Sequence, residues 1–185
     1  MGTRGLLGFI IRGKRHAAYN HWDSYPSGLG SQIVAFLLSL SPPDYALMLA
    51  RLEEITWVDE KTIPSQELQD QYSALGYSNT GVGNQALSDW YCLLHKLQGA
   101  AALPAIKEGK VKHLAESIEF LEDGLFCEWT YFIDFEAQTL ETWKEAKRYD
   151  VRSFTELDSG YMDGLQERYQ REENGEEEED DEEEA

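Results

Sequence analysis

Apolar residues occupy every second position from 125 to 135, and this pattern constrains the fold more than any other feature of the chain. Leu125, Cys127, Trp129, Tyr131, Ile133 and Phe135 share one face, while Glu128, Thr130 and Asp134 are among the residues on the other. A period of two is typical of a β-strand with one buried face. Residues 136–138 can form a turn into a second strand at 139–143, so a hairpin is predicted here.

A second hairpin is predicted at the N-terminus. Residues 5–12 are apolar and rich in β-forming residues, residues 13–14 offer a turn, and residues 15–22 provide a returning strand. The chain between the two hairpins carries helical patterns. We therefore expect an α+β fold in which the N-terminal and C-terminal β-hairpins form one antiparallel sheet that packs against a helical middle.

The clearest helix start in the middle of the chain lies at Ser41. Ser41 suits the N-cap, Pro42 suits the first helical position, and Asp44 completes a capping box. Further helices are expected at residues 31–40, 64–75, 84–94, 111–121 and 156–170, and a short strand at 55–58.

Length and charge divide the chain into two parts. A chain of 185 residues suits one folded domain, and we predict a single α+β domain over residues 1–171. Residues 172–184 contain eleven acidic residues and no basic residue, and removing them from the net charge of −19 leaves −8. Residues 172–185 are therefore predicted to form a disordered acidic tail. Its expected partner is a basic protein or the basic residues of segment 4–15.

Cysteine content and hydropathy set the expected environment. Cys92 and Cys127 are 35 positions apart and show no metal-type spacing, which predicts reduced thiols in an intracellular protein of the cytoplasm or nucleus. The longest apolar stretch, residues 33–40, is far shorter than the ~20 residues that span a bilayer, so no membrane contact is expected. Nucleic-acid binding is not expected either, because the acidic tail repels phosphate.

The segment with the richest chemistry is residues 19–30, YNHWDSYPSGLG. It places Asn20, His21 and Asp23 at a strand end and in the following loop, and such loops often carry function. On a strand, His21 and Asp23 would face the same side, where an aspartate can hold an imidazole as a base or both can ligate a metal. The catalytic candidates are therefore His21, Asp23 and Asn20, while the cofactor and metal stay undetermined.

The same segment also has a structural interpretation. Asp23 and Ser24 are residue types that stabilise turns, and Trp22 and Tyr25 can pack beneath such a turn. Both interpretations are left open by the sequence.

Two segments, MGTRGLLGF and YNHWDSYPSGLG, resemble a family of small uncharacterised proteins from fungi and from bacteriophage or bacterial genomes. Members of that family begin M-G/A-T-R and carry an H-W/F-D-x-Y-P motif. The resemblance rests on Thr3, Arg4, His21, Asp23, Tyr25 and Pro26, within residues 1–30, with a weaker similarity in residues 127–143. The family has no established activity, so the resemblance implies a grouping and no mechanism.

A second resemblance is architectural and implies an alternative fold. A strand at the extreme N-terminus, a glycine turn, a returning strand and a loop with Asn and Asp are similar to the start of N-terminal-nucleophile hydrolases, which have a layered fold. Those enzymes expose Cys, Ser or Thr as the first mature residue. Here, removal of Met1 leaves Gly2, and Thr3 would serve only after further trimming.

Two main functional hypotheses follow. The first is an intracellular binding or regulatory module that uses residues 19–30, because aromatic residues make up 12% of the chain while no convergent catalytic set is visible. The alternative is a small hydrolase centred on His21 and Asp23, either metal-assisted or acting through Thr3. A third class, an acidic chaperone for basic proteins, rests on the tail alone. Whether the chain is an enzyme stays open.

Overall fold

The computed structural model describes residues 2–83 and 85–175. Its helices are α1 (Ser31–Ser39), α2 (Pro42–Glu53), α3 (Gln66–Ala74), α4 (Trp90–Leu93), α5 (Ala102–Lys107) and α6 (Tyr161–Glu173). Its strands are β1 (Gly5–Ile11), β2 (Lys14–Asn20), β3 (Thr56–Val58), β4 (His113–Ala115), β5 (Trp129–Asp134), β6 (Thr139–Lys144) and β7 (Lys147–Ser153). The predicted α+β class is confirmed.

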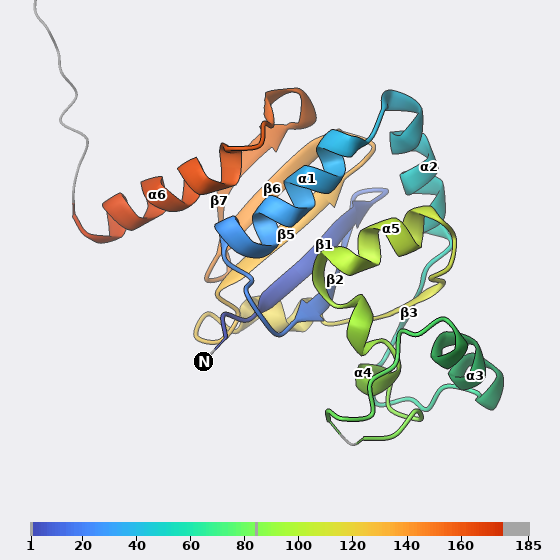
Figure 1. Ribbon diagram of the computed structural model, residues 1–185. Helices are drawn as coiled ribbons and strands as arrows, with labels where there is room; N and C mark the ends of the chain where they lie inside the picture. The colour runs from blue at the N-terminus through green and yellow to red at the C-terminus, as the bar shows by residue number, and fades with distance from the viewer. Residues whose placement is uncertain (1, 84, 176–185) are drawn as a thin grey trace, which may run out of the picture.

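The main sheet has the strand order β2-β1-β5-β6-β7 (Figure 1). Both predicted hairpins are present in it, as the antiparallel pairs β1–β2 and β5–β6. The sheet differs from the prediction in one pair, because β1 and β5 run parallel, from Gly5 opposite Trp129 to Phe9 opposite Ile133. The sheet is therefore mixed. Hydrophobic pattern identifies the strands but carries no information on the direction of the neighbour.

Strand β7 was not predicted, and the reason lies in the turn before it. The β6–β7 turn is formed by Glu145 and Ala146, whose φ angles are +49° and +65°. Tight hairpin turns with positive φ usually contain Asn or Gly, so this pair gives no turn signal. A β-bulge also interrupts the alternation along β7, because Tyr149 has no partner between Asp150, which pairs with Thr142, and Arg148, which pairs with Trp143.

The prediction of a helix at residues 111–121 is wrong. This segment instead contains β4, which pairs in parallel with β3, followed by the 3₁₀ helix η4 (Ile118–Glu122). The backbone N of Glu116 donates to Val58 O at 2.9 Å, and the N of Ser117 donates to Ala17 O at 2.8 Å. Tertiary hydrogen bonds thus replace the local helical bonds that the periodicity suggested.

The helix predicted at residues 84–94 is also mostly wrong, because α4 is the only helix within 85–94, the described part of this range. Asp89 caps it by accepting a hydrogen bond from the N of Tyr91 at 2.8 Å. The helices expected around residues 31–40 and 64–75 are confirmed as α1 and α3, and Ser41 is the N-cap of α2 as predicted.

Helix α6 begins later than predicted and reaches Glu173, so the first residues of the predicted tail are helical. Residues 176–185, the rest of that tail, lie outside the described residues. No single helix in the described part of the chain is long and apolar enough to cross a membrane, although the bent pair Pro26–Ser39 and Pro42–Glu53 reaches that length and composition together.

The two faces of the sheet are covered differently. Helices α1 and α6 lie over one face (Figure 1), where Leu7, Tyr131 and Ile133 join the main hydrophobic core. On the other face, Phe132 and Cys127 pack with Leu6 and with side chains of η4. Strand β5 is thus buried on both faces, and Cys127 does not share the face of Tyr131 as the alternation predicted. Strand β5 begins only at Trp129, so residues 125–128 precede the sheet, and Leu125 is 76% exposed.

A buried polar contact joins α3 to β4. The hydroxyl of Tyr72, a fully buried residue, accepts a hydrogen bond from the N of Lys112 at 3.1 Å and contacts Nδ1 of His113 at 2.7 Å. The His113 ring stacks on Trp90 with 5.6 Å between ring centres. Burial lowers the pKa of His113 below its ordinary value of 6.5.

We predict that the free energy of unfolding decreases as the pH falls through the ordinary pKa of histidine. The unfolded chain then binds a proton at His113 that the folded state resists, so stability is lost toward acid and regained toward neutrality. Urea unfolding between about pH 7.5 and pH 5.5 measures this slope. The variant His113→Gln should flatten it, and an equal slope in both proteins would contradict the assignment. His95, whose pKa is also lowered by burial, contributes with the same sign, so His95→Gln is the parallel measurement.

Tyr131 ties the sheet to the loop that follows β2. Its fully buried hydroxyl donates to the carbonyl O of Ser24 at 2.8 Å. We predict that Tyr131→Phe lowers the free energy of unfolding by about 1–3 kcal/mol, because the Ser24 carbonyl then loses its partner in the interior. The matched control is Tyr45→Phe, since the hydroxyl of Tyr45 forms no hydrogen bond with another described residue. A loss no larger than that of the control, in chemical denaturation, would disprove the role of this bond.

Candidate functional site

The antiparallel pairing of β1 and β2 brings the two segments of the N-terminal motif together. Gly5 lies opposite Asn20, and the N of Ser24 donates to Thr3 O at 3.1 Å. The residues that carry the family resemblance are thus neighbours in space. Gly2 lies against the Trp22 ring, and Met1 lies outside the described residues.

Asn20 and Asp23 shape the loop between β2 and α1. The Asn20 side chain is buried, and its Nδ2 donates to Trp22 O at 2.6 Å and to Ser24 Oγ at 2.8 Å. Asp23 has a left-handed φ of +53°, and its carbonyl accepts a hydrogen bond from the N of Leu29 at 2.8 Å. Its carboxylate is exposed and has no hydrogen-bond partner among the described residues. The loop is thus held by structural contacts, but they come from Asn20 and the Asp23 backbone rather than from the Asp23 carboxylate, and Trp22, expected to pack beneath the turn, is 59% exposed.

His21 contacts tyrosine rather than Asp23. Its Nδ1 lies 2.7 Å from the hydroxyl of Tyr19, and its backbone N donates to Oε1 of Gln98 at 3.1 Å. The other end of the same amide, Nε2 of Gln98, lies 3.4 Å from Nδ1 of His95. Within residues 2–83 and 85–175, no group of three or more His, Cys, Asp or Glu side chains is arranged to hold a metal ion.

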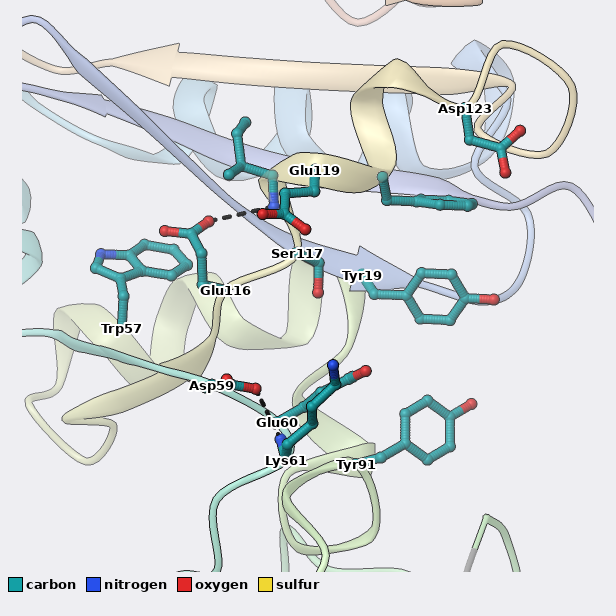
Figure 2. Close-up of a pocket in the computed structure, with 12 residues that line it drawn as sticks. Tyr19, Trp57, Asp59, Glu60, Lys61, Tyr91, Glu116, Ser117, Glu119 and Asp123 are labelled. Carbon is teal, nitrogen blue, oxygen red and sulfur yellow. Dashed lines mark hydrogen bonds between the residues drawn. The ribbon is translucent and has the colours of Figure 1, made fainter.

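A large cleft lies next to this loop, on the other side of Tyr19. Its volume is about 960 Å³. It lies between the segment after β3 and the segment from β4 to residue 123, with β2 and α4 at one end (Figure 2). We call it the acidic cleft, and it is lined by Tyr19, Trp57, Asp59, Glu60, Lys61, Tyr91, Glu116, Ser117, Ile118, Glu119, Phe120 and Asp123.

Five carboxylates and one lysine set the charge of the acidic cleft. Figure 2 shows Asp59 and Glu60 on one wall and Glu116 and Glu119 on the facing wall. The side chains of Glu60 and Glu119 are exposed and form no hydrogen bond or salt bridge with another described residue. A cleft lined by one sign of charge concentrates ligands of the opposite sign.

Two other carboxylates of the cleft, those of Asp59 and Asp123, hold turns. Oδ1 of Asp59 accepts a hydrogen bond from the N of Lys61 at 2.9 Å. Oδ1 of Asp123 accepts from the N of Leu125 at 3.1 Å and from the N of Phe126 at 3.0 Å. These contacts fix the backbone after β3, at Asp59, and the backbone after η4, at Asp123.

Glu116 holds the cleft wall in place. Its Oε1 accepts hydrogen bonds from the N of Ala17 at 3.1 Å and the N of Ile118 at 3.3 Å, and its Oε2 lies 2.5 Å from Nδ1 of His16. The His16 ring in turn stacks on Trp57 with 4.8 Å between ring centres. Glu116 therefore positions β2, η4 and Trp57 relative to one another and has little capacity left for a ligand.

Aromatic rings form the end of the cleft opposite Trp57. Tyr19 packs edge-on against Phe120 with 5.4 Å between ring centres, and lies 6.3 Å from Tyr91. Figure 2 shows the Tyr19 and Tyr91 hydroxyls pointing the same way at this end. Burial raises the pKa of the Tyr19 hydroxyl, so it stays protonated at neutral pH.

The sequence contained little signal for this site. Its lining comes from segments that are distant in the chain, and only Tyr19 belongs to the loop that the sequence singled out. The wrong helix at 111–121 also placed Glu116 and Glu119 on a helix surface rather than on a cleft wall. Comparisons with protein-family models, curated proteins and solved structures find no match to this chain.

Proposed function

We propose that this chain is a binding module that takes a basic segment of a partner polypeptide into the acidic cleft. The observation that carries the proposal is the combination of five carboxylates with half-buried aromatic rings around a hollow of about 960 Å³. Lysine and arginine side chains match both features, because they pair with carboxylates and stack on aromatic faces.

The carboxylates serve attraction and orientation more than raw affinity. An exposed ion pair contributes only about 0–1 kcal/mol, so Glu60 and Glu119 alone do not hold a ligand tightly. The rings of Tyr19 and Tyr91 add cation–π and apolar contact, each cation–π contact being worth about 0.5–1 kcal/mol at an exposed site. Several such contacts along one extended segment give the moderate affinity of a regulatory interaction.

This proposal keeps the binding function expected from the sequence and changes its location. Residues 19–30 contribute Tyr19 to the cleft, while Asn20 and Asp23 stabilise the neighbouring turn. A basic protein is also the partner that the charge of the predicted tail favours, and that contact stays a prediction. The hydrolase centred on His21 and Asp23 stays a prediction without a geometric argument in its favour.

We predict that a short lysine- and arginine-rich peptide binds the protein, and that Glu60→Gln with Glu119→Gln weakens binding about tenfold. The two exposed charges together supply about 1.4 kcal/mol, which is a factor of ten in affinity. Fluorescence polarisation of a labelled peptide measures the dissociation constant, which should also rise with salt because exposed pairs are screened.

The matched control is Glu67→Gln with Glu167→Gln, which removes the same charge from exposed positions outside the cleft. Equal weakening in both double variants would show that net charge rather than the cleft attracts the peptide. No binding of basic peptides to the full chain would disprove the proposed function.

A further inference from the structure

A small apolar pit opens from the acidic cleft. It has a volume of about 50 Å³ and shares Tyr19, Glu60, Tyr91 and Ser117 with the cleft. The remaining residues that line this apolar pit are Ala18, Trp90, Leu94, Leu97, Gln98, Leu114 and Ala115. The rim of the pit is therefore polar and acidic, and its interior is almost entirely hydrocarbon.

The floor of the pit belongs to the rigid core. Leu94, Leu97 and Leu114 are buried members of the main hydrophobic cluster. They come from the C-terminal end of α4, the following 3₁₀ turn and β4, three elements whose backbones are fixed by tertiary contacts. Such a floor offers a preformed surface, so a ligand does not have to order it.

Two polar groups of the pit, the indole of Trp90 and the amide of Gln98, already have partners within the protein. Nε1 of Trp90 donates to Oγ1 of Thr62 at 3.2 Å. The Gln98 amide is held between His21 and His95 at both of its ends. An apolar occupant would therefore leave neither group without a hydrogen bond, whereas a polar occupant would find few partners inside.

The size of the pit selects the kind of occupant. One water needs roughly 10–15 Å³ of such volume, so the pit holds a few water-sized groups, which corresponds to an aliphatic side chain of three or four carbons. An aromatic side chain is too large. The carboxylate of Glu60 at the rim and the other carboxylates of the cleft favour basic residues on either side of that side chain.

We propose, on the basis of the proposed function, that the pit receives one aliphatic side chain of the basic segment. The recognised motif is then a leucine-sized residue flanked by lysine or arginine. The aliphatic residue acts as an anchor in a desolvated pocket. The flanking cations pair with Glu60 at the rim and with the other carboxylates of the cleft. The pit supplies specificity that an acidic surface alone lacks, since carboxylates accept any basic sequence.

The test uses the full chain and peptides that are identical except at one central position between lysines. A central leucine should bind about tenfold more tightly than a central serine, because its apolar side chain leaves water when it enters the pit and only part of that gain is lost to ordering the side chain. A central lysine should bind like serine. The dissociation constants come from fluorescence polarisation or calorimetry.

A variant that fills the pit, Ala115→Leu, should remove the preference for leucine and leave the affinity for the serine peptide unchanged. Ala18→Val fills it from the opposite strand and replaces the first variant if thermal unfolding shows that Ala115→Leu does not fold. The matched control is Ala50→Leu on the exposed face of α2, which should keep the preference.

The two proposals fail in different ways. Equal binding of leucine, serine and lysine peptides to the unaltered chain would overturn the role of the pit and leave the acidic cleft as the binding site. A leucine preference that persists in both pit-filling variants would overturn it as well. No binding of any of these peptides would overturn the proposed function and the pit together.

Discussion

Between β1 and β5, the register from Gly5 opposite Trp129 to Phe9 opposite Ile133 joins two hairpins from opposite ends of the chain in one sheet. The rest of the structure depends on this parallel pairing. A parallel pair needs a long connection, and here the connection contains the helical middle, β3 and β4. Because β1 and β5 lie at the centre of the sheet, both of their faces are covered. The cleft is built from the chain that makes this connection.

The second sheet, β3–β4, is attached to the first through the return of the chain to β5. The backbone N of Ser117 donates to Ala17 O, and the carboxylate of Glu116 accepts from the N of Ala17. These bonds hold the end of β4 beside β2, so η4 passes over the far face of the main sheet. The space left between this passage and the segment after β3 is the acidic cleft. The shape of the site thus results from the same contacts that close the far face.

The sequence predicted those parts of the fold whose signals are local. The capping box at Ser41 and the alternation through β5 depend on neighbouring residues, and both marked real elements. The helix predicted at 111–121 failed because β4 takes its hydrogen bonds from β3, which a helical periodicity cannot reveal. The prediction of the site was limited for the same reason. His21 and Asp23 are close in sequence but have different partners, whereas Glu60 and Glu119 share a cleft only through tertiary structure.

The acidic residues of the cleft are not equivalent, although composition counts them alike. Glu116 uses both oxygens on β2, η4 and His16, and Asp59 and Asp123 each hold a turn. Only Glu60 and Glu119 are exposed without such a task among the described residues. A protein that needed negative charge only for solubility would gain nothing from placing two such carboxylates in a cleft that aromatic rings also line, because charge anywhere on the surface serves that purpose. Both line a cleft together with Tyr19 and Tyr91, and Glu60 also lines the apolar pit, which favours recognition of a ligand over general acidity.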